Sequence, residues 1–106
     1  MEGRSQMNSY TVGTAVKCQM TFYSDEAQTT VADPTGITFR VRAPSGTITE
    51  YIYGTDAELV KSGTGVYYVL VTPTAGGIWK YAFEGTGAVV ETKERQFLAT
   101  NTIFQI

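Results

Sequence analysis

The sequence contains no histidine and only one cysteine, Cys18. Histidine is the usual general base of hydrolytic triads and the commonest metal-binding side chain, so its absence removes most catalytic templates. A single cysteine cannot form a disulfide within the chain, and the fold must therefore be held together by packing. Cys18 alternates with apolar neighbours, which favours a core position over a reactive thiol. We expect no enzyme activity, no catalytic residues, no metal and no cofactor.

Charge and long apolar runs are also scarce. Charged residues make up 17% of the chain, and eight basic against ten acidic residues give a net charge of −2. That balance does not favour binding to a phosphate backbone, which proteins hold with clustered Lys and Arg. No stretch near the start has signal-peptide length, and no window approaches the roughly 18 apolar residues of a membrane span. We expect no nucleic-acid partner, no membrane contact and synthesis in the cytoplasm.

Alternation of apolar and polar residues is the strongest pattern that is present. The chain has 11 glycines, seven tyrosines and five phenylalanines, a mixture typical of β-strands joined by tight turns. The run from Ala15 to Tyr23 alternates with period two, and so do the runs after Gly36, Gly65 and Gly77. The residues predicted to face inward are Val16, Cys18, Met20, Phe22, Ile37, Phe39, Val41, Tyr67, Val69, Val71 and, at the centre of the core, Trp79, Tyr81 and Phe83.

The segment from Thr47 to Tyr53 follows a Pro-Ser-Gly turn and is predicted to form a hairpin with the strand before it. Its two faces compete for the core, because both carry large side chains. One face consists of Ile48, Glu50 and Ile52, and the other of Thr49, Tyr51 and Tyr53. We predict that Ile48 and Ile52 face inward.

Two of three later features are open to more than one interpretation. The run Glu58–Lys61 is predicted to be a minor edge strand. A final strand is predicted from Ala88 to about Ala99, and its polar middle, Glu91 to Gln96, indicates a bulge or an edge position. Tyr67, in a Gly-Val-Tyr segment, fits either a tyrosine corner whose hydroxyl bonds to upstream backbone or a plain core residue.

About seven strands at spacings of roughly ten residues, with turns between them and no helical periodicity, predict the fold class. It is an all-β, immunoglobulin-like β-sandwich of antiparallel strands without a disulfide. We divide the chain into an N-terminal arm (residues 1–9), the sandwich domain (10–100) and an apolar C-terminal tail (101–106). The first six residues precede a second methionine, Met7, and fit an arm, an alternative start or an added segment equally well.

Acidic and glycine-rich loops are the remaining candidates for chemistry. Five carboxylates lie in or near turns, those of Asp25, Glu26, Asp33, Asp56 and Glu58. Their spacing matches no ligand template such as the EF-hand loop, so we interpret them as solvated or turn-forming groups. Two Gly-Thr-Gly segments do not lead into helices, which favours hairpin turns over phosphate-binding loops.

Outward-pointing apolar residues are the candidate partner-binding residues. Tyr68, Leu70 and Ile78 are predicted to point outward from neighbouring late strands, and such a patch is typical of a contact surface. Scattered exposed apolar residues also occur on proteins without partners. The tail adds three large apolar side chains, those of Ile103, Phe104 and Ile106. We expect the tail to add a strand to a partner or to fill a groove on it.

A series of short motifs runs through the chain in a recognisable order. They are Asp33-Pro34, Phe39-Arg40-Val41-Arg42-Ala43-Pro44-Ser45-Gly46, Gly54-Thr55-Asp56, Gly65-Val66-Tyr67, Gly77-Ile78-Trp79-Lys80-Tyr81, Glu94 and Phe97. With this succession, from about Tyr10 to Ala99, the chain resembles a small family of immunoglobulin-like structural proteins encoded among the head and tail genes of tailed phages. These motifs are mostly turn glycines and core aromatics, so they specify the fold better than the role.

The resemblance implies a structural component of a tailed bacteriophage virion, as a capsid surface decoration, a head-tail junction protein or a tail accessory protein. It implies assembly with other virion proteins (capsid, connector or tail), several symmetry-related copies as a homo-oligomer, and localisation in the virion. The Pro-Ser-Gly hairpin and the Gly-x-Tyr segment also resemble filamin-type repeats, which bind partners by strand addition. The alternative is a generic immunoglobulin-like binding or adhesion module that recognises a protein or carbohydrate ligand.

Overall fold

Eight β-strands make up most of the part of the chain that the computed structural model describes, residues 8–25, 27–87 and 89–101. The strands are β1 (Asn8–Thr11), β2 (Val16–Thr21), β3 (Gly36–Arg42), β4 (Ile48–Ile52), β5 (Val60–Gly63), β6 (Val66–Val71), β7 (Gly77–Thr86) and β8 (Glu91–Thr100). No helix in this part of the chain has the length and apolarity needed to cross a membrane.

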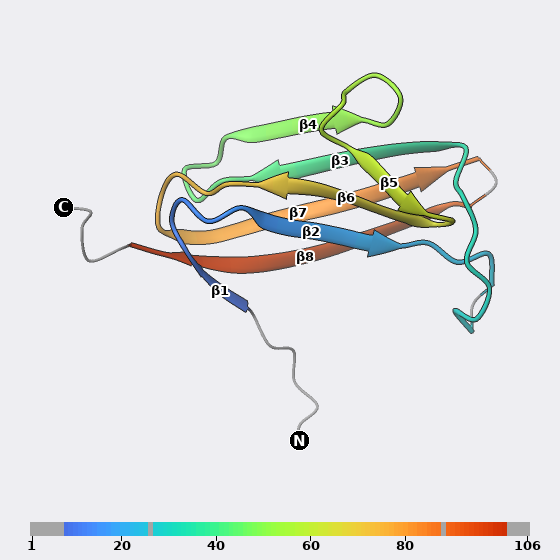
Figure 1. Cartoon of the computed structure of the whole chain (residues 1–106), viewed down its shortest axis with the longest axis horizontal. Coiled ribbons are helices and arrows are strands. Elements are labelled where there is room, and N and C mark those ends of the chain that lie inside the picture. Colours follow the sequence, from blue (N-terminus) through green and yellow to red (C-terminus); the bar gives the residue numbers. More distant parts are fainter. Residues whose placement is uncertain (1–7, 26, 88, 102–106) are drawn as a thin grey trace.

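The strands form two sheets, one of five strands in the order β1-β8-β7-β3-β4 and one of three in the order β2-β6-β5. In Figure 1 the strands of the smaller sheet overlie those of the larger. The orders β8-β7-β3 and β2-β6-β5 match the two sheets of an immunoglobulin sandwich, and β4 extends the first sheet as in variable-type domains. The predicted immunoglobulin-like β-sandwich is therefore confirmed.

The strand count and one strand direction differ from the prediction. The described residues form eight strands where about seven were predicted, and β1 pairs with β8 in parallel while all other pairs are antiparallel. The strand that was missed is β1. Its four residues, Asn8 to Thr11, include one large apolar side chain, which is too little for a period of two to show.

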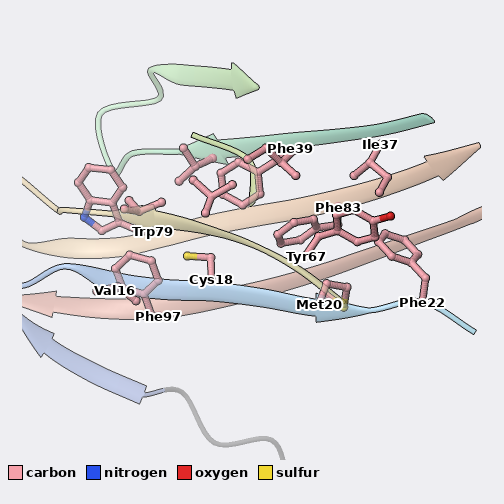
Figure 2. Close-up of a cluster of buried hydrophobic side chains, with 14 of the residues drawn as sticks. Val16, Cys18, Met20, Phe22, Ile37, Phe39, Tyr67, Trp79, Phe83 and Phe97 are labelled. Carbon is pink, nitrogen blue, oxygen red and sulfur yellow. The ribbon is translucent and has the colours of Figure 1, made fainter. Parts of the chain in front are cut away.

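The core lies between the two sheets and is rich in aromatic rings (Figure 2). Figure 2 shows Trp79 and Phe22 toward opposite ends of the cluster, with Cys18 between them. The rings of Phe39 and Phe83 meet edge to face at a centroid distance of 4.8 Å, a favourable aromatic geometry. The predicted inward residues of β2, β3 and β6 are all buried, and of the predicted core centre Trp79 and Phe83 are buried while Tyr81 is half-buried.

The prediction for β4 was wrong, because the strand faces the other way. Ile48 and Ile52 are 60% and 44% exposed, whereas Tyr51 is half-buried and its ring stacks on Phe39 at a centroid distance of 6.3 Å. Since side chains alternate along a strand, Glu50 must share a face with the two isoleucines. Burying them would have buried a carboxylate as well, which is strongly unfavourable without a paired charge.

The polar half of β8 is explained by an edge position. Among the described residues, β1 pairs with β8 only from Phe97 to Thr100, so no described strand lies beside the stretch from Glu91 to Gln96 on that side. The pairing of β8 with β7 runs without a register shift, so no bulge is present there. The predicted minor edge strand is also found, two residues later than expected, as β5, whose pairing with β6 shifts between Lys61 and Gly63.

Candidate binding surfaces

Each sheet turns one face to the core and one face outward, and the larger outward face carries the candidate site. We call it the large-sheet face and define it as the outward side chains of β3, β4, β7 and β8. The register places these side chains in rows across the strands, including the row Gln96, Lys80, Arg42 and Ile48 and the row Glu94, Ala82, Arg40 and Glu50. Side chains directly opposite in such a row have Cβ atoms about 5 Å apart.

The charge of Arg40 is neutralised within this face. Its Nε atom donates to Glu50 Oε2 at 2.8 Å, and its Nη1 atom donates to Glu84 Oε1 at 3.3 Å. These bonds raise the pKa of Arg40, with the Glu50 bond as the main cause. The three side chains remain between 41% and 47% exposed, so the network orders the face more than it stabilises the fold.

The neighbouring row is different, because two positive charges stand side by side in it. Arg42 on β3 lies directly opposite Lys80 on β7. Neither side chain forms an ion pair or hydrogen bond with another described residue. Like charges in this position repel each other. We call Arg42 and Lys80 the basic pair.

The basic pair stands between two adjoining hollows of the large-sheet face. The larger hollow, of about 770 Å³, runs from β4 across to β8 and is lined by residues that include Ile48, Tyr81 and Glu94. The smaller, of about 390 Å³, lies toward the end of the sheet and includes Pro44 and Ile78. Arg42 and Lys80 line both hollows. Ile48 and Ile78, which are 60% and 41% exposed, thus flank the pair with apolar surface.

The opposite side of the molecule, the small-sheet face, consists of the outward side chains of β2, β5 and β6. Leu70 is 57% exposed there, opposite Lys17. The ammonium group of Lys17 lies 4.6 Å from the ring centroid of the half-buried Tyr68, in a cation–π contact. The positive charge of Lys17 thus already has a favourable contact within the domain, unlike the charges of the basic pair.

The predicted partner-binding residues do not form one patch. Tyr68 and Leu70 lie on β6 in the small sheet, whereas Ile78 lies on β7 in the large sheet. The prediction that they point outward is correct for Leu70 and Ile78, and Tyr68 is half-buried. Their placement on neighbouring strands was wrong, because the chain crosses between sheets after β6. Three more predicted residues, Ile103, Phe104 and Ile106, lie outside the described residues.

The residues that sequence reasoning missed are Ile48, Ile52 and the basic pair. Glu50 could have indicated the orientation of the two isoleucines. It lies between them at alternate positions of the strand, so all three side chains share one face, and a carboxylate favours the outward face. With Ile48 and Ile52 facing outward, they share a face with the charged alternate residues of β3, including Arg42. That Lys80 stands opposite Arg42 depends on which strands are neighbours, and no short-range pattern carries that information.

Asp33, one of the predicted turn carboxylates, bonds to three residues at the end of the sandwich away from the smaller hollow. Asp33 Oδ1 accepts hydrogen bonds from Gly65 N at 2.7 Å and from the Tyr67 hydroxyl at 2.9 Å, and Asp33 Oδ2 accepts from Lys61 Nζ at 2.9 Å. We call these four residues the Asp33 cluster. The bond from Lys61, followed by those from Gly65 and Tyr67, lowers the pKa of Asp33 to about 2. Tyr67 thus bonds to a carboxylate and not to upstream backbone, so the tyrosine-corner interpretation was wrong.

Two further aspartates serve their own loops. Asp25 accepts bonds from the backbone N–H groups of Thr29 and Thr30 and from the Thr29 hydroxyl, which is the main cause of its lowered pKa. Asp56 Oδ2 accepts from Ile52 N at 2.8 Å. Within the described ranges, no three His, Cys, Asp or Glu side chains gather where they could hold a metal ion.

Cys18 carries the only thiol of the chain. Its side chain is fully buried in the core. Burial raises the pKa of its thiol to about 12. The thiol is therefore protonated at neutral pH, whereas nucleophilic attack requires the thiolate. The position of Cys18 is that of a packed core residue.

No family model matches the chain, and no curated protein is similar to it. Among solved structures, it is similar to part of the chitinase ChiW from Paenibacillus sp. str. FPU-7, a multi-modular enzyme expressed at the bacterial cell surface. The TM-score is 0.50 and the sequence identity 15%. The match covers 92% of this chain and 9% of the chitinase chain. At this identity the likeness shows the fold alone, in agreement with the observed sandwich.

Proposed function

We propose that this domain is a structural component of a tailed bacteriophage virion that docks onto another virion protein through its large-sheet face. The observation that carries the proposal of docking is the exposure of Ile48, Ile52 and Ile78 on that one face, where Ile48 lines the larger hollow and Ile78 the smaller. Exposed apolar groups gathered on a small domain are typical of contact surfaces. The virion assignment depends on the sequence resemblance, whose motifs here build turns and core.

Two motifs of the resemblance contain glycines that close backbone contacts require, and one of the two lies beside the proposed docking face. Gly65 has a φ of +75° and brings its backbone against Phe22 and Ala32, while its N–H binds Asp33. Gly77 has a φ of +131° and lies against Pro44, at the end of the sheet beside the smaller hollow. The shared motifs therefore include residues that shape the rim of the proposed docking face.

Mass spectrometry of purified virions tests the assignment. We expect the chain in the particles at a fixed ratio to the major capsid protein, because closed symmetric assemblies have fixed stoichiometry. A further comparison tests the face. Ile48→Asp should prevent incorporation, whereas Leu70→Asp on the small-sheet face should not. Absence of the unaltered chain from virions would contradict the proposal.

A second candidate is a binding module within a larger protein. The structural neighbour is multi-modular and contains this fold as 9% of its length. In that case the chain should bind its ligand as an isolated monomer and should be missing from particles. Sedimentation of the purified protein, together with the particle analysis above, distinguishes the two candidates.

A further inference from the structure

We propose that the basic pair, Arg42 and Lys80, is a recognition site for a carboxylate on a partner protein, presented next to an aliphatic side chain. This inference rests on the proposed docking role of the large-sheet face and specifies the chemistry of the partner. Arg42 and Lys80 would bind the partner's carboxylate, a role that the packing of the domain does not require of them.

Adjacent rows of the large-sheet face differ in how their charges are paired. Arg40 is held between Glu50 and Glu84, although Arg42, two residues along the same strand, has no such partner among the described residues. Its direct neighbour across the sheet is another cation, Lys80. A carboxylate placed between the two would relieve their repulsion and receive charge-assisted hydrogen bonds from both.

The surface around the basic pair is hollowed and partly aliphatic. Both cations line both hollows, and the smaller hollow is completed by Ala43, Pro44 and Ile78. A partner side chain that enters this hollow meets aliphatic surface within reach of the two charges. The site therefore suits an acidic residue with an adjacent Leu, Ile or Val, and Ile48 on the other side of Arg42 extends the apolar contact.

The distribution of charge on the large-sheet face favours a protein carboxylate over a polyanion. A nucleic acid is held by many cations along its backbone. The large-sheet face carries the basic pair and Arg40, and Arg95 also lines the larger hollow, yet the face holds the carboxylates of Glu50, Glu84 and Glu94 as well. The whole chain has a net charge of −2. A continuous phosphate backbone crossing this face would meet those carboxylates, whereas a single side chain would not.

The test is titration of the full ¹⁵N-labelled chain with the capped peptide acetyl-Glu-Leu-Glu-Leu-Glu-Leu-amide, followed by amide chemical shifts. We expect saturable shifts that centre on Arg42, Lys80 and Ile48 and that weaken as salt is added. Arg42→Gln/Lys80→Gln should reduce the affinity at least about tenfold, the loss expected for one charge-assisted hydrogen bond. The matched control is Lys17→Gln, a neutralised cation on the small-sheet face, which should keep the affinity.

Controls make a negative result informative. The neutral peptide acetyl-Gln-Leu-Gln-Leu-Gln-Leu-amide and a single-stranded oligothymidine are titrated in parallel. The proposal is overturned if the acidic peptide gives no saturable shifts at millimolar concentration, if the neutral peptide binds as well, or if the oligonucleotide binds the same residues more tightly. Thermal unfolding of each variant verifies that it is folded.

The two proposals fail separately. If the chain is found in virions and Arg42→Gln/Lys80→Gln is incorporated like the unaltered chain, the acidic partner is wrong and the virion role stands. If the chain is absent from virions but binds the acidic peptide through the basic pair, the recognition site stands and the virion role is wrong.

Discussion

The Asp33 cluster and the basic pair lie in the same small sandwich and use charge in opposite ways. Around Asp33 the carboxylate is met by an ammonium group, a backbone N–H and a hydroxyl, so its negative charge connects the loop before β3 with the β5–β6 hairpin. At the basic pair two positive charges face each other without a carboxylate between them among the described residues. The charge at the first site is matched within the domain, whereas the charge at the second is the one for which we propose a partner carboxylate.

Residues that stabilise a fold can be distinguished from residues that bind a partner by the effect of their removal on stability. A group whose removal destabilises the domain is explained by the fold. When removal stabilises the domain or leaves it unchanged, and that group also sits in a hollow beside exposed apolar side chains, it needs another explanation. Natural proteins often keep such groups because function requires them.

The largest effect is expected from Gly65→Ala, at the backbone of the Asp33 cluster. A Cβ at Gly65 would lie 2.8 Å from the carbonyl oxygen of Phe22, and its φ of +75° disfavours any L side chain. Positive φ and overpacking together should lower the free energy of unfolding by about 2–5 kcal/mol. Urea denaturation followed by tryptophan fluorescence measures this.

The matched control is Gly54→Ala. Gly54 has a φ of +90°, but nothing lies within 4 Å of a Cβ there. It should lose only the conformational part, about 1–2 kcal/mol. Equal losses at the two glycines would show that the close backbone contact at Gly65 contributes nothing.

Tyr67→Phe removes one hydroxyl from the Asp33 cluster and leaves the buried ring in place. The hydroxyl donates to a charged carboxylate, so we expect a loss of about 1–2 kcal/mol. Tyr68→Phe, on the next residue and the outward face, should change stability by less than about 0.5 kcal/mol. If both variants unfold at the same urea concentration, the hydroxyl of Tyr67 is not part of what holds this end together.

Acid should weaken the Asp33 cluster. The pKa of Asp33 is lowered from 3.8 to about 2 in the fold, so its stabilisation is fully present above pH 4 and is lost as the pH falls toward 2. Asp33→Asn should therefore be less stable than the unaltered chain at pH 6 and should lose less on acidification. Parallel stability curves of the two proteins between pH 4 and 2 would contradict the assignment.

The smallest effect is expected at the basic pair, and its sign is opposite. Arg42→Gln removes a like-charge contact, which should raise the free energy of unfolding by about 0.2–0.5 kcal/mol at low salt and by less at high salt. Arg40→Gln should have the reverse sign, because it breaks the bonds to Glu50 and Glu84. A clear loss of stability from Arg42→Gln would show that Arg42 stabilises the fold, as the Asp33 cluster does.

Sequence reasoning found most of the fold because alternation reports burial directly. Val16, Cys18, Met20 and Phe22 alternate without interruption, and all four are buried. The pattern failed at β4, where large apolar side chains occur at both parities and only Glu50 separates them. It also failed at β1, because a four-residue strand is too short to show a period.

The candidate site was harder to predict, because it depends on which strands are neighbours. Leu70 and Ile78 are separated by few residues in the chain, yet they point to opposite sides of the sandwich, since the segment after β6 carries the chain from one sheet to the other. Arg42 and Lys80 are distant in sequence and opposite in space. Only the assembled sheets bring such residues together or separate them.

The parallel pairing of β1 with β8 has a mechanical consequence. The two strands run in the same direction from Asn8 opposite Phe97 to Thr11 opposite Thr100, and Val12 N donates to Thr100 O just beyond. A pull on the start of β1 against the end of β8 slides one strand along the other, so the hydrogen bonds between them are strained together and do not open one after another. The domain can thus transmit tension between β1 and β8 through a pairing of only four residues.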